Sequence, residues 1–156
     1  MPLSVGDKAP DFSLTDQDGS VHSLKEHAGK WLLIYFYPKD DTPGCTTEAC
    51  SIRDHWAEFE KAGLTVLGVS TDSLKSHEKF AIKYKLPFPL LADEEKKMVE
   101  AYGVWGKKKF MGREYLGTKR WSFLVNPKGI IKKIYEDVKP QEHVGQVLAD
   151  YRALAA

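Results

Sequence analysis

The pattern of apolar and polar residues predicts an α/β fold. Residues 31–37 and 64–70 are continuous apolar runs with the length of strands buried on both faces. Between them, apolar side chains recur at steps of three and four residues, at Ala49, Ile52, Trp56 and Phe59. This spacing predicts a helix over residues 43–62, with Gly63 as its C-terminal cap. Strand, helix and strand in this order form a right-handed βαβ unit.

Short apolar runs separated by turn residues predict two hairpins. The first turn lies at residues 16–19, between a short run ending at Leu14 and one that starts at Val21. The second lies at residues 126–129 and joins two longer runs. Leu90-Leu91 is a brief extended stretch between the two hairpins.

Further helices are expected over residues 73–85, after Asp93 as N-terminal cap, and after Pro140. Residues 103–119 are rich in glycine and lysine and have no clear period, so they predict a long surface loop that carries the basic residues of 107–113. Together the elements predict an α/β fold with a central mixed β-sheet and helices on both of its faces.

The composition fits one domain over residues 1–156, because 42% of the residues are hydrophobic. With 23 basic and 22 acidic side chains, the chain lacks the positive excess of a nucleic-acid-binding protein. The longest apolar run, residues 31–37, is too short to cross a bilayer, and the first seven residues do not resemble a secretory signal. We therefore expect a cytoplasmic protein with neither nucleic acid nor membrane as partner.

The two cysteines, Cys45 and Cys50, are too few for a disulfide framework, and a close pair in a reducing compartment indicates redox or nucleophilic chemistry. Cys45 falls in the first turn of the predicted helix, with Thr42 as N-cap and Pro43 at the first helical position. Unpaired backbone N–H groups and the positive end of the helix dipole favour an anion there. A thiolate is therefore the expected form of Cys45.

The spacing of the cysteines predicts two states. Cys45 continues the apolar stripe toward the sheet, whereas Cys50 lies about 140° further round the helix, with its α-carbon roughly 8.6 Å away. Disulfides rarely join α-carbons more than about 7 Å apart, so the two sulfurs can bond only if the helix locally unwinds. We expect a wound helix with a reactive thiolate and an unwound one with a disulfide.

Two other interpretations of the cysteines are open at this point. Both could be small buried apolar residues, the commonest fate of free cysteines. A zinc site is disfavoured, because Cys45, Cys50 and His55 follow at steps of five and do not share a helix face.

Complete ionisation of a typical thiol adds at most about 30-fold in rate. An enzyme therefore needs further hydrogen-bond donors that stabilise the charge of the transition state. Arg120, at the start of a predicted strand, can supply one, although an arginine there is commonly a surface residue.

At these residues the chain resembles a peroxiredoxin, and closely the peroxiredoxin Q or bacterioferritin comigratory protein subfamily. The family signature Pro-x-x-x-Thr-x-x-Cys stands here as Pro38, Thr42 and Cys45, at the predicted junction of strand and helix. Cys50 matches the position of a resolving cysteine five residues downstream, and Arg120 also matches. The similarity extends over nearly the whole length, including residues 6–12 and 87–93.

The resemblance implies a thioredoxin-like fold and the reduction of hydrogen peroxide and organic hydroperoxides. It makes Cys45 the peroxidatic and Cys50 the resolving cysteine. Thr42 is expected to hydrogen-bond the thiolate and the peroxide, Arg120 to stabilise thiolate and transition state, and Pro38 to shield the sulfenic acid. The intramolecular disulfide is expected to be reduced by thioredoxin, with electrons from NADPH. No metal, haem or flavin cofactor is implied, and a monomer is expected.

One departure from the family is Trp121, where relatives usually carry a small hydroxyl residue. Two other functions compete. A thiol-disulfide oxidoreductase of the same fold normally shows Cys-x-x-Cys, but here Thr42 stands in place of the first cysteine. A redox sensor or holdase could use the same unwinding to expose Trp56 and Phe59 to a partner.

Overall fold

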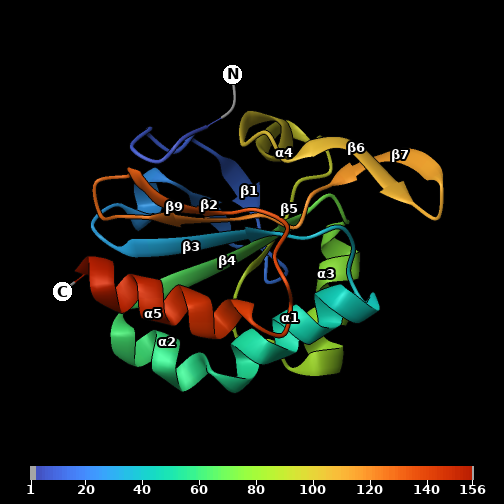
Figure 1. Ribbon diagram of the computed structural model, residues 1–156. Helices are drawn as coiled ribbons and strands as arrows, with labels where there is room; N and C mark the ends of the chain where they lie inside the picture. Colours follow the sequence, from blue (N-terminus) through green and yellow to red (C-terminus); the bar gives the residue numbers. More distant parts are fainter. Residues whose placement is uncertain (1–2, 156) are drawn as a thin grey trace.

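The computed structural model describes residues 3–155 and has the expected α/β class, with a mixed sheet at its centre (Figure 1). The expected domain over residues 1–156 therefore has its two ends outside the described residues. In chain order the elements are β1 (Ser13–Thr15), β2 (Val21–Ser23), the 3₁₀ helix η1 (Lys25–His27), β3 (Trp31–Phe36), α1 (Pro43–Asp54), α2 (Trp56–Ala62), β4 (Leu64–Ser70), α3 (Leu74–Tyr84), β5 (Leu90–Ala92), α4 (Lys97–Ala101), β6 (Trp105–Phe110), β7 (Arg113–Thr118), β8 (Ser122–Val125), β9 (Ile131–Tyr135) and α5 (His143–Ala155).

The central sheet has the strand order β5-β4-β3-β8-β9. Strands β3, β4 and β5 are parallel to one another, and β8 and β9 are antiparallel to their neighbours. The expected βαβ unit and both expected hairpins are confirmed, since β3 pairs with β4, β1 with β2 and β8 with β9. The sheet places the end of β3, which leads into α1, beside the start of β8.

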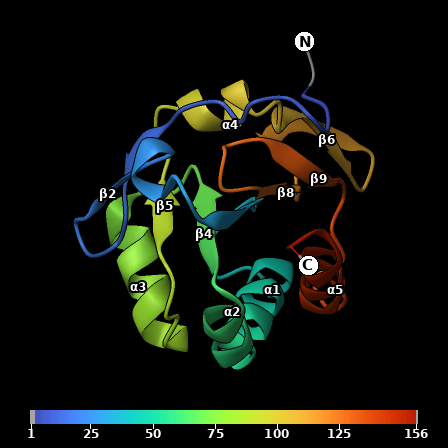
Figure 2. The same cartoon turned by 90° about the vertical axis from the view of Figure 1, so that its left-hand side faces the viewer.

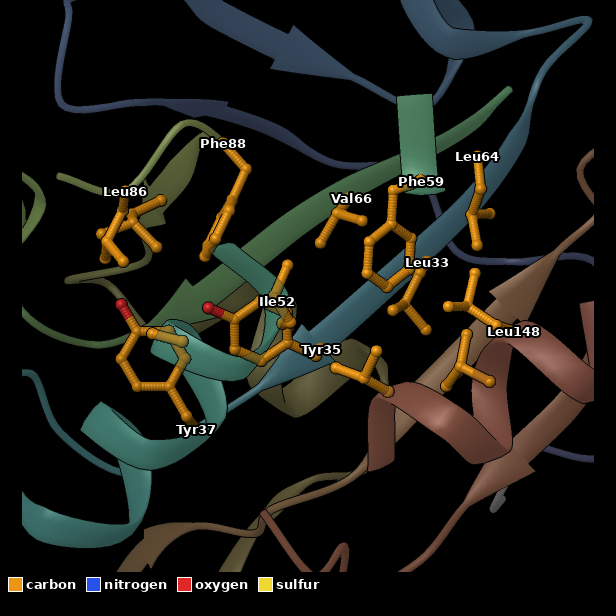
Figure 3. Packing of buried hydrophobic residues seen from close by; sticks show 14 of the residues in the cluster. Leu33, Tyr35, Tyr37, Ile52, Phe59, Leu64, Val66, Leu86, Phe88 and Leu148 are labelled. Atoms are coloured by element: carbon orange, nitrogen blue, oxygen red, sulfur yellow. The ribbon is translucent and has the colours of Figure 1, made fainter. Parts of the chain in front are cut away.

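Helices cover both faces of the sheet, but unequally (Figure 2). Helices α1, α2, α3 and α5 lie on one face, and α4 lies on the other together with the N-terminal segment. On the four-helix side, Ile52 and Phe59 pack against Leu33 and Val66 of the sheet (Figure 3). The stripe predicted from the sequence is this packed face, because Cys45, Ala49, Ile52 and Phe59 are all buried.

The single helix expected over residues 43–62 is wrong, because the chain breaks at His55 into α1 and α2. The ring Nδ1 of His55 donates to the carbonyl of Ser51 over 2.8 Å, where it competes with the backbone amide of His55, which also points at that oxygen. Gly63 caps α2 in the left-handed conformation, as expected.

Two other helix starts are corrected. Helix α4 begins at Lys97, later than expected, although the Asp93 carboxylate still accepts the N–H of Val99 in its first turn. Helix α5 begins at His143, because a turn in which Glu142 donates to Lys139 occupies the residues after Pro140.

The surface loop expected over residues 103–119 is instead the hairpin of β6 and β7, which projects from the body of the molecule (Figure 1). Its side chains are largely exposed, so the pattern shows no apolar alternation. The turn is made by Met111 and Gly112, both with positive φ (52° and 78°), as a two-residue hairpin turn of type I′ requires.

Within residues 3–155, no helix has both the length and the apolar composition needed to cross a membrane.

Candidate active site

Cys45 lies in the first turn of α1, as the sequence predicts. Thr42 is the N-cap, with extended backbone (φ −100°, ψ 156°), and Pro43 begins the helix. The Cys45 side chain is 1% exposed, because its helix face packs against the sheet. The first turn of a helix leaves backbone N–H groups without intrahelical partners, and these favour an anionic Cys45.

Arg120 approaches the sulfur from the neighbouring strand. It precedes β8, which pairs with β3, so two segments 75 residues apart meet at one end of the sheet. Its Nη2 donates to Cys45 Sγ over 3.4 Å. Burial acts to lower the pKa of Arg120, but the neighbouring Cys45 and Glu48 outweigh it and raise the pKa. The sulfur therefore faces a permanent positive charge.

Gly44 makes room for this contact. A Cβ built at position 44 would lie 3.4 Å from Arg120 Cζ and 2.8 Å from its Nη2, and the second distance is closer than van der Waals contact allows. Any side chain at this position therefore displaces the guanidinium. The requirement for glycine was not predicted, because it depends on a residue that comes close only in the folded chain.

Glu48 is a site residue that the sequence reasoning missed. It lies one turn after Cys45 on the same side of α1, it is 1% exposed, and its Oε1 accepts from Arg120 Nη1 over 3.2 Å. Burial raises its pKa to about 7, against the opposing effect of Arg120. The spacing of three residues from Cys45 on a buried stripe was the available signal.

The hydroxyl of Tyr35 on β3 is a second buried polar group at this site. Burial raises the pKa of Tyr35 well above its usual value, helped by the charges of Glu48 and Cys45, so the phenol stays neutral. Among residues 3–155, neither this hydroxyl nor Glu48 Oε2 has a hydrogen-bond partner. The base of the site thus holds polar atoms with unused hydrogen-bonding capacity.

Thr42 differs from the expectation. Its hydroxyl donates to the carbonyl of Lys39 over 2.9 Å, and within the described part of the chain it forms no hydrogen bond to the Cys45 sulfur. Since a hydroxyl has one hydrogen, Thr42 Oγ1 is left with lone pairs that can accept a bond. Pro38 is half-buried in the loop between β3 and α1.

Cys50 lies on α1 as well, half-buried and off the packed face, and both cysteines are free thiols. Because α1 is continuous from Pro43 to Asp54, the two sulfurs cannot bond without unwinding it. The structure is therefore that of the wound, reduced state expected from the spacing.

The β6–β7 hairpin borders the site. A pocket next to Arg120 is lined by Lys107, Lys108, Lys109, Lys119, Arg120, Trp121, Asp137 and Val138. Burial and Arg120 lower the pKa of Lys108, and Cys45 acts to raise it, which places this lysine in the electrostatic environment of the sulfur. The Trp121 ring lies 5.3 Å from Lys119 Nζ. The departure at Trp121 therefore contributes to the wall of this pocket.

In the described residues, one group of side chains brings possible metal-ligand atoms together: Asp40, Asp72 and His77, within 4.8 Å of one another. Both ring nitrogens of His77 already face oxygen acceptors, Asp40 Oδ2 at 2.6 Å and the Leu91 carbonyl at 2.9 Å. A ring whose two nitrogens both face acceptors has no lone pair directed at a cation, and the chemistry of the site rests on the thiols.

Comparisons with known proteins agree with this geometry. Residues 5–134 match the model of the AhpC/TSA family. A putative peroxiredoxin Bcp of Coxiella burnetii is 47% identical over 148 residues, covering 95% of this chain and 98% of the relative. Peroxiredoxin Bcp of Escherichia coli is 48% identical over 147 residues, covering 94% of each chain.

Solved structures of related proteins also match this chain. The bacterioferritin comigratory protein of Xanthomonas campestris, studied for its alkyl peroxide reduction activity, matches with a TM-score of 0.88 at 41% identity, over 93% of this chain and 92% of that one. A peroxiredoxin Q mutant of Xylella fastidiosa matches with a TM-score of 0.93 at 32% identity, over 100% of this chain and 99% of that one. The thioredoxin-like fold is thereby confirmed. With a buried cysteine beside a fixed guanidinium at the start of α1, the chain belongs to the AhpC/TSA family and is a peroxiredoxin of the Bcp or peroxiredoxin Q type.

Proposed function

We propose that this peroxidase reduces hydrogen peroxide and organic hydroperoxides with Cys45 as its peroxidatic cysteine and Cys50 as its resolving cysteine. The observation that carries the proposal is the hydrogen bond from Arg120 Nη2 to the buried Cys45 sulfur in the first turn of α1. A helix N-terminus and a guanidinium both stabilise a thiolate, which is the nucleophilic form of cysteine.

In the first step the thiolate attacks one oxygen of the peroxide. An S–O bond forms and the O–O bond breaks, so the sulfur is oxidised to a sulfenic acid while the leaving oxygen takes up a proton and departs as water or an alcohol. Negative charge develops on the oxygens as the bond breaks. Arg120 is held by Glu48 at a position from which it can stabilise that charge.

Thr42 and Pro38 are assigned to binding and shielding. Because the Thr42 hydrogen is donated to Lys39, Thr42 Oγ1 accepts the O–H of the bound peroxide and orients it toward the sulfur. Pro38 limits the access of water to the sulfenic acid from the side of the loop.

In the second step Cys50 attacks the sulfenic sulfur, an S–S bond forms and water leaves. The bond requires unwinding of α1, after which a dithiol reductant returns both cysteines to thiols and is itself oxidised to a disulfide. We assign that role to thioredoxin, supplied by NADPH, in the cytoplasm. The enzyme acts as a monomer and a single domain over residues 1–156, with no nucleic-acid partner.

The roles of the two cysteines are tested with Cys45→Ser and Cys50→Ser in a peroxide consumption assay. Cys45→Ser is expected to consume no peroxide, and Cys50→Ser to consume one equivalent and stop as a sulfenic acid that dimedone traps. Full turnover by Cys45→Ser contradicts the assignment. Catalysis of insulin reduction without peroxide consumption favours the thiol-disulfide oxidoreductase, and one oxidation without turnover in the presence of thioredoxin favours the redox sensor.

A further inference from the structure

A buried polar cluster holds the loop that leads into the active-site helix. Asp40, five residues before Cys45, accepts from Tyr37 Oη over 2.6 Å and from Ser76 Oγ over 2.8 Å. Its Oδ2 also lies 2.6 Å from Nδ1 of His77 on α3. Asp40 is 7% exposed and His77 0%. The peroxide chemistry described above uses none of these side chains.

The contacts of His77 indicate where its ring hydrogens lie. Its Nε2 faces the carbonyl oxygen of Leu91 at 2.9 Å, and a carbonyl can only accept, so Nε2 carries a hydrogen. Its Nδ1 faces Asp40 Oδ2 at 2.6 Å, so a hydrogen must lie between these two atoms as well. Tyr37 and Ser76 also donate to Asp40, so both carboxylate oxygens act as acceptors and this geometry places the shared hydrogen on the ring.

The surroundings of the pair come from four parts of the fold. Tyr37 lies just after β3, Asp72 follows β4, Ser76 lies on α3 and the Leu91 carbonyl on β5. Asp72 adds a second negative charge and accepts the backbone N–H of Asp40 over 2.8 Å and the hydroxyl of Ser70 over 2.7 Å.

The next residue is attached to the same helix. Asp41 has a positive φ of 56°, an unfavourable conformation for aspartate, and its carboxylate accepts from Lys83 Nζ over 2.7 Å and from Tyr84 Oη over 2.8 Å. Two consecutive aspartates are thus bound to α3 directly before Thr42. Their bonds fix the point from which α1 starts, and hence the position of Cys45 relative to Arg120.

We propose that His77 is a positioning residue of the peroxidatic site: as the buried cationic partner of Asp40, it holds the loop of residues 38–42 against α3. This inference rests on the proposed role of Cys45. His77 makes no contact with the peroxide in this proposal. Replacing His77 therefore shifts the positions of the reacting groups but removes none of them.

The test compares Asp40→Asn, His77→Gln and the double variant with the unmodified protein in the single-turnover oxidation of Cys45 by hydrogen peroxide. Each single variant is expected to lose about tenfold to a hundredfold in rate, as small misplacements of reacting groups do. The double variant is expected to lose no more than the worse single variant, because the two residues act through one contact. Alkylation of Cys45 by iodoacetamide is expected to slow by less than the peroxide reaction, because it depends on the thiolate but not on the placement of a bound peroxide.

The matched control is His22→Gln, which removes another histidine–aspartate pair, with Nε2 2.7 Å from Asp16 Oδ2, in the β1–β2 hairpin. It is expected to react with peroxide at the unmodified rate. Circular dichroism and thermal unfolding establish that each variant is folded at the assay temperature. In ¹⁵N-labelled protein at pH 7, NMR of the His77 ring is expected to show hydrogen on both nitrogens.

Two results overturn the inference: peroxide rates of folded Asp40→Asn and His77→Gln within twofold of the unmodified protein, or a His77 ring with hydrogen on one nitrogen only. Rate losses of the two single variants that add up in the double variant also overturn it, because additive losses mean that Asp40 and His77 act independently. If the proposed role of Cys45 were wrong, the unmodified protein itself would lack the fast reaction, and that outcome is distinct from these.

Discussion

At the scale of single residues, the reactivity of the site depends on how closely Arg120 can approach Cys45. The guanidinium donates to Cys45 Sγ with one nitrogen and to Glu48 Oε1 with another, so its orientation is fixed by a two-pronged contact that lysine cannot reproduce. The space for it exists because residue 44 has no side chain.

Gly44→Ala tests this packing. The added methyl group lies 2.8 Å from Arg120 Nη2 and must displace it, so we expect the second-order rate constant for hydrogen peroxide to fall about 100-fold with the fold intact. Stopped-flow measurement of the change in tryptophan fluorescence on oxidation gives the rate. Gly145→Ala in α5 is the control, since among the described residues nothing lies within 4 Å of its new Cβ. A rate for Gly44→Ala equal to that of Gly145→Ala shows that the close approach has no function.

Glu48 predicts a pH dependence of stability. Its pKa rises from 4.5 to about 7 on folding, so its contribution to stability is fully present below pH 4.5 and is lost as the pH rises through about 7. The difference in the free energy of unfolding between the unmodified protein and Glu48→Gln should therefore decrease by about 3 kcal/mol from pH 4 to pH 8.

Urea unfolding of both proteins at each pH measures this difference. His143, whose burial lowers its pKa to about 4, acts in the opposite sense as the pH falls, but it is present in both proteins and cancels. A difference that is constant with pH means that the pKa of Glu48 does not change on folding.

The residues of the site were predictable to different degrees. Pro38, Thr42 and Cys45 are identified by a sequence signature, Cys45 also by its place in the first helical turn, and Arg120 by the resemblance to the family. Glu48 and Gly44 acquire their roles only through contact with Arg120, which lies far along the chain. In place of the expected bond to the sulfur, the Thr42 hydroxyl donates its hydrogen to the carbonyl of Lys39.

At the scale of elements, two features of α1 favour the local unwinding that the proposed disulfide requires. Its N-cap makes no side-chain hydrogen bond, and no acidic residue occupies its first turn. At the other end, the break at His55 separates α1 from α2, so unwinding of α1 need not disturb Phe59 in the core. The break was not predicted, because the apolar stripe continues through it without interruption.

Oxidation is therefore expected to lower the helix content. Joining Cys45 to Cys50 must unwind about half of the 12 residues of α1, which reduces the far-ultraviolet ellipticity at 222 nm. Cys50→Ser is the control, because it forms the sulfenic acid but no disulfide and should keep the spectrum of the reduced protein. An unchanged spectrum on complete oxidation of both thiols would falsify the two-state account.

At the scale of the whole molecule, the topology explains why a short motif suffices to identify the fold. The long apolar runs became β3 and β4, and the motif lies where β3 meets α1. Parallel pairing of β3 with β4 and antiparallel pairing with β8 then bring Arg120 to the same end of the sheet. The β6–β7 hairpin was missed because, apart from Trp105 and Thr118 at its base, its side chains are largely exposed, and residue patterns report burial rather than pairing.

The hairpin also predicts a response to salt. Lys107, Lys108, Lys109 and Lys119 surround Arg120 at the pocket, so an anionic dithiol reductant is attracted to the site. Charges are screened over about 10 Å at 0.1 M salt, and this distance shortens as salt is added. The rate at which thioredoxin reduces the disulfide is therefore expected to fall several-fold between 20 mM and 500 mM salt, while the rate with neutral dithiothreitol stays constant. Equal salt dependence for both reductants contradicts a role of the lysines in docking.

The central claim is that one peroxide molecule converts the thiols of Cys45 and Cys50 into one disulfide within the chain. The most direct test is the intact mass of the reduced protein after one equivalent of hydrogen peroxide, with the free thiols counted in the same sample. The account predicts a monomer that has lost two hydrogens and retains no free thiol. An unchanged mass with both thiols free, or a disulfide-linked dimer, would contradict it.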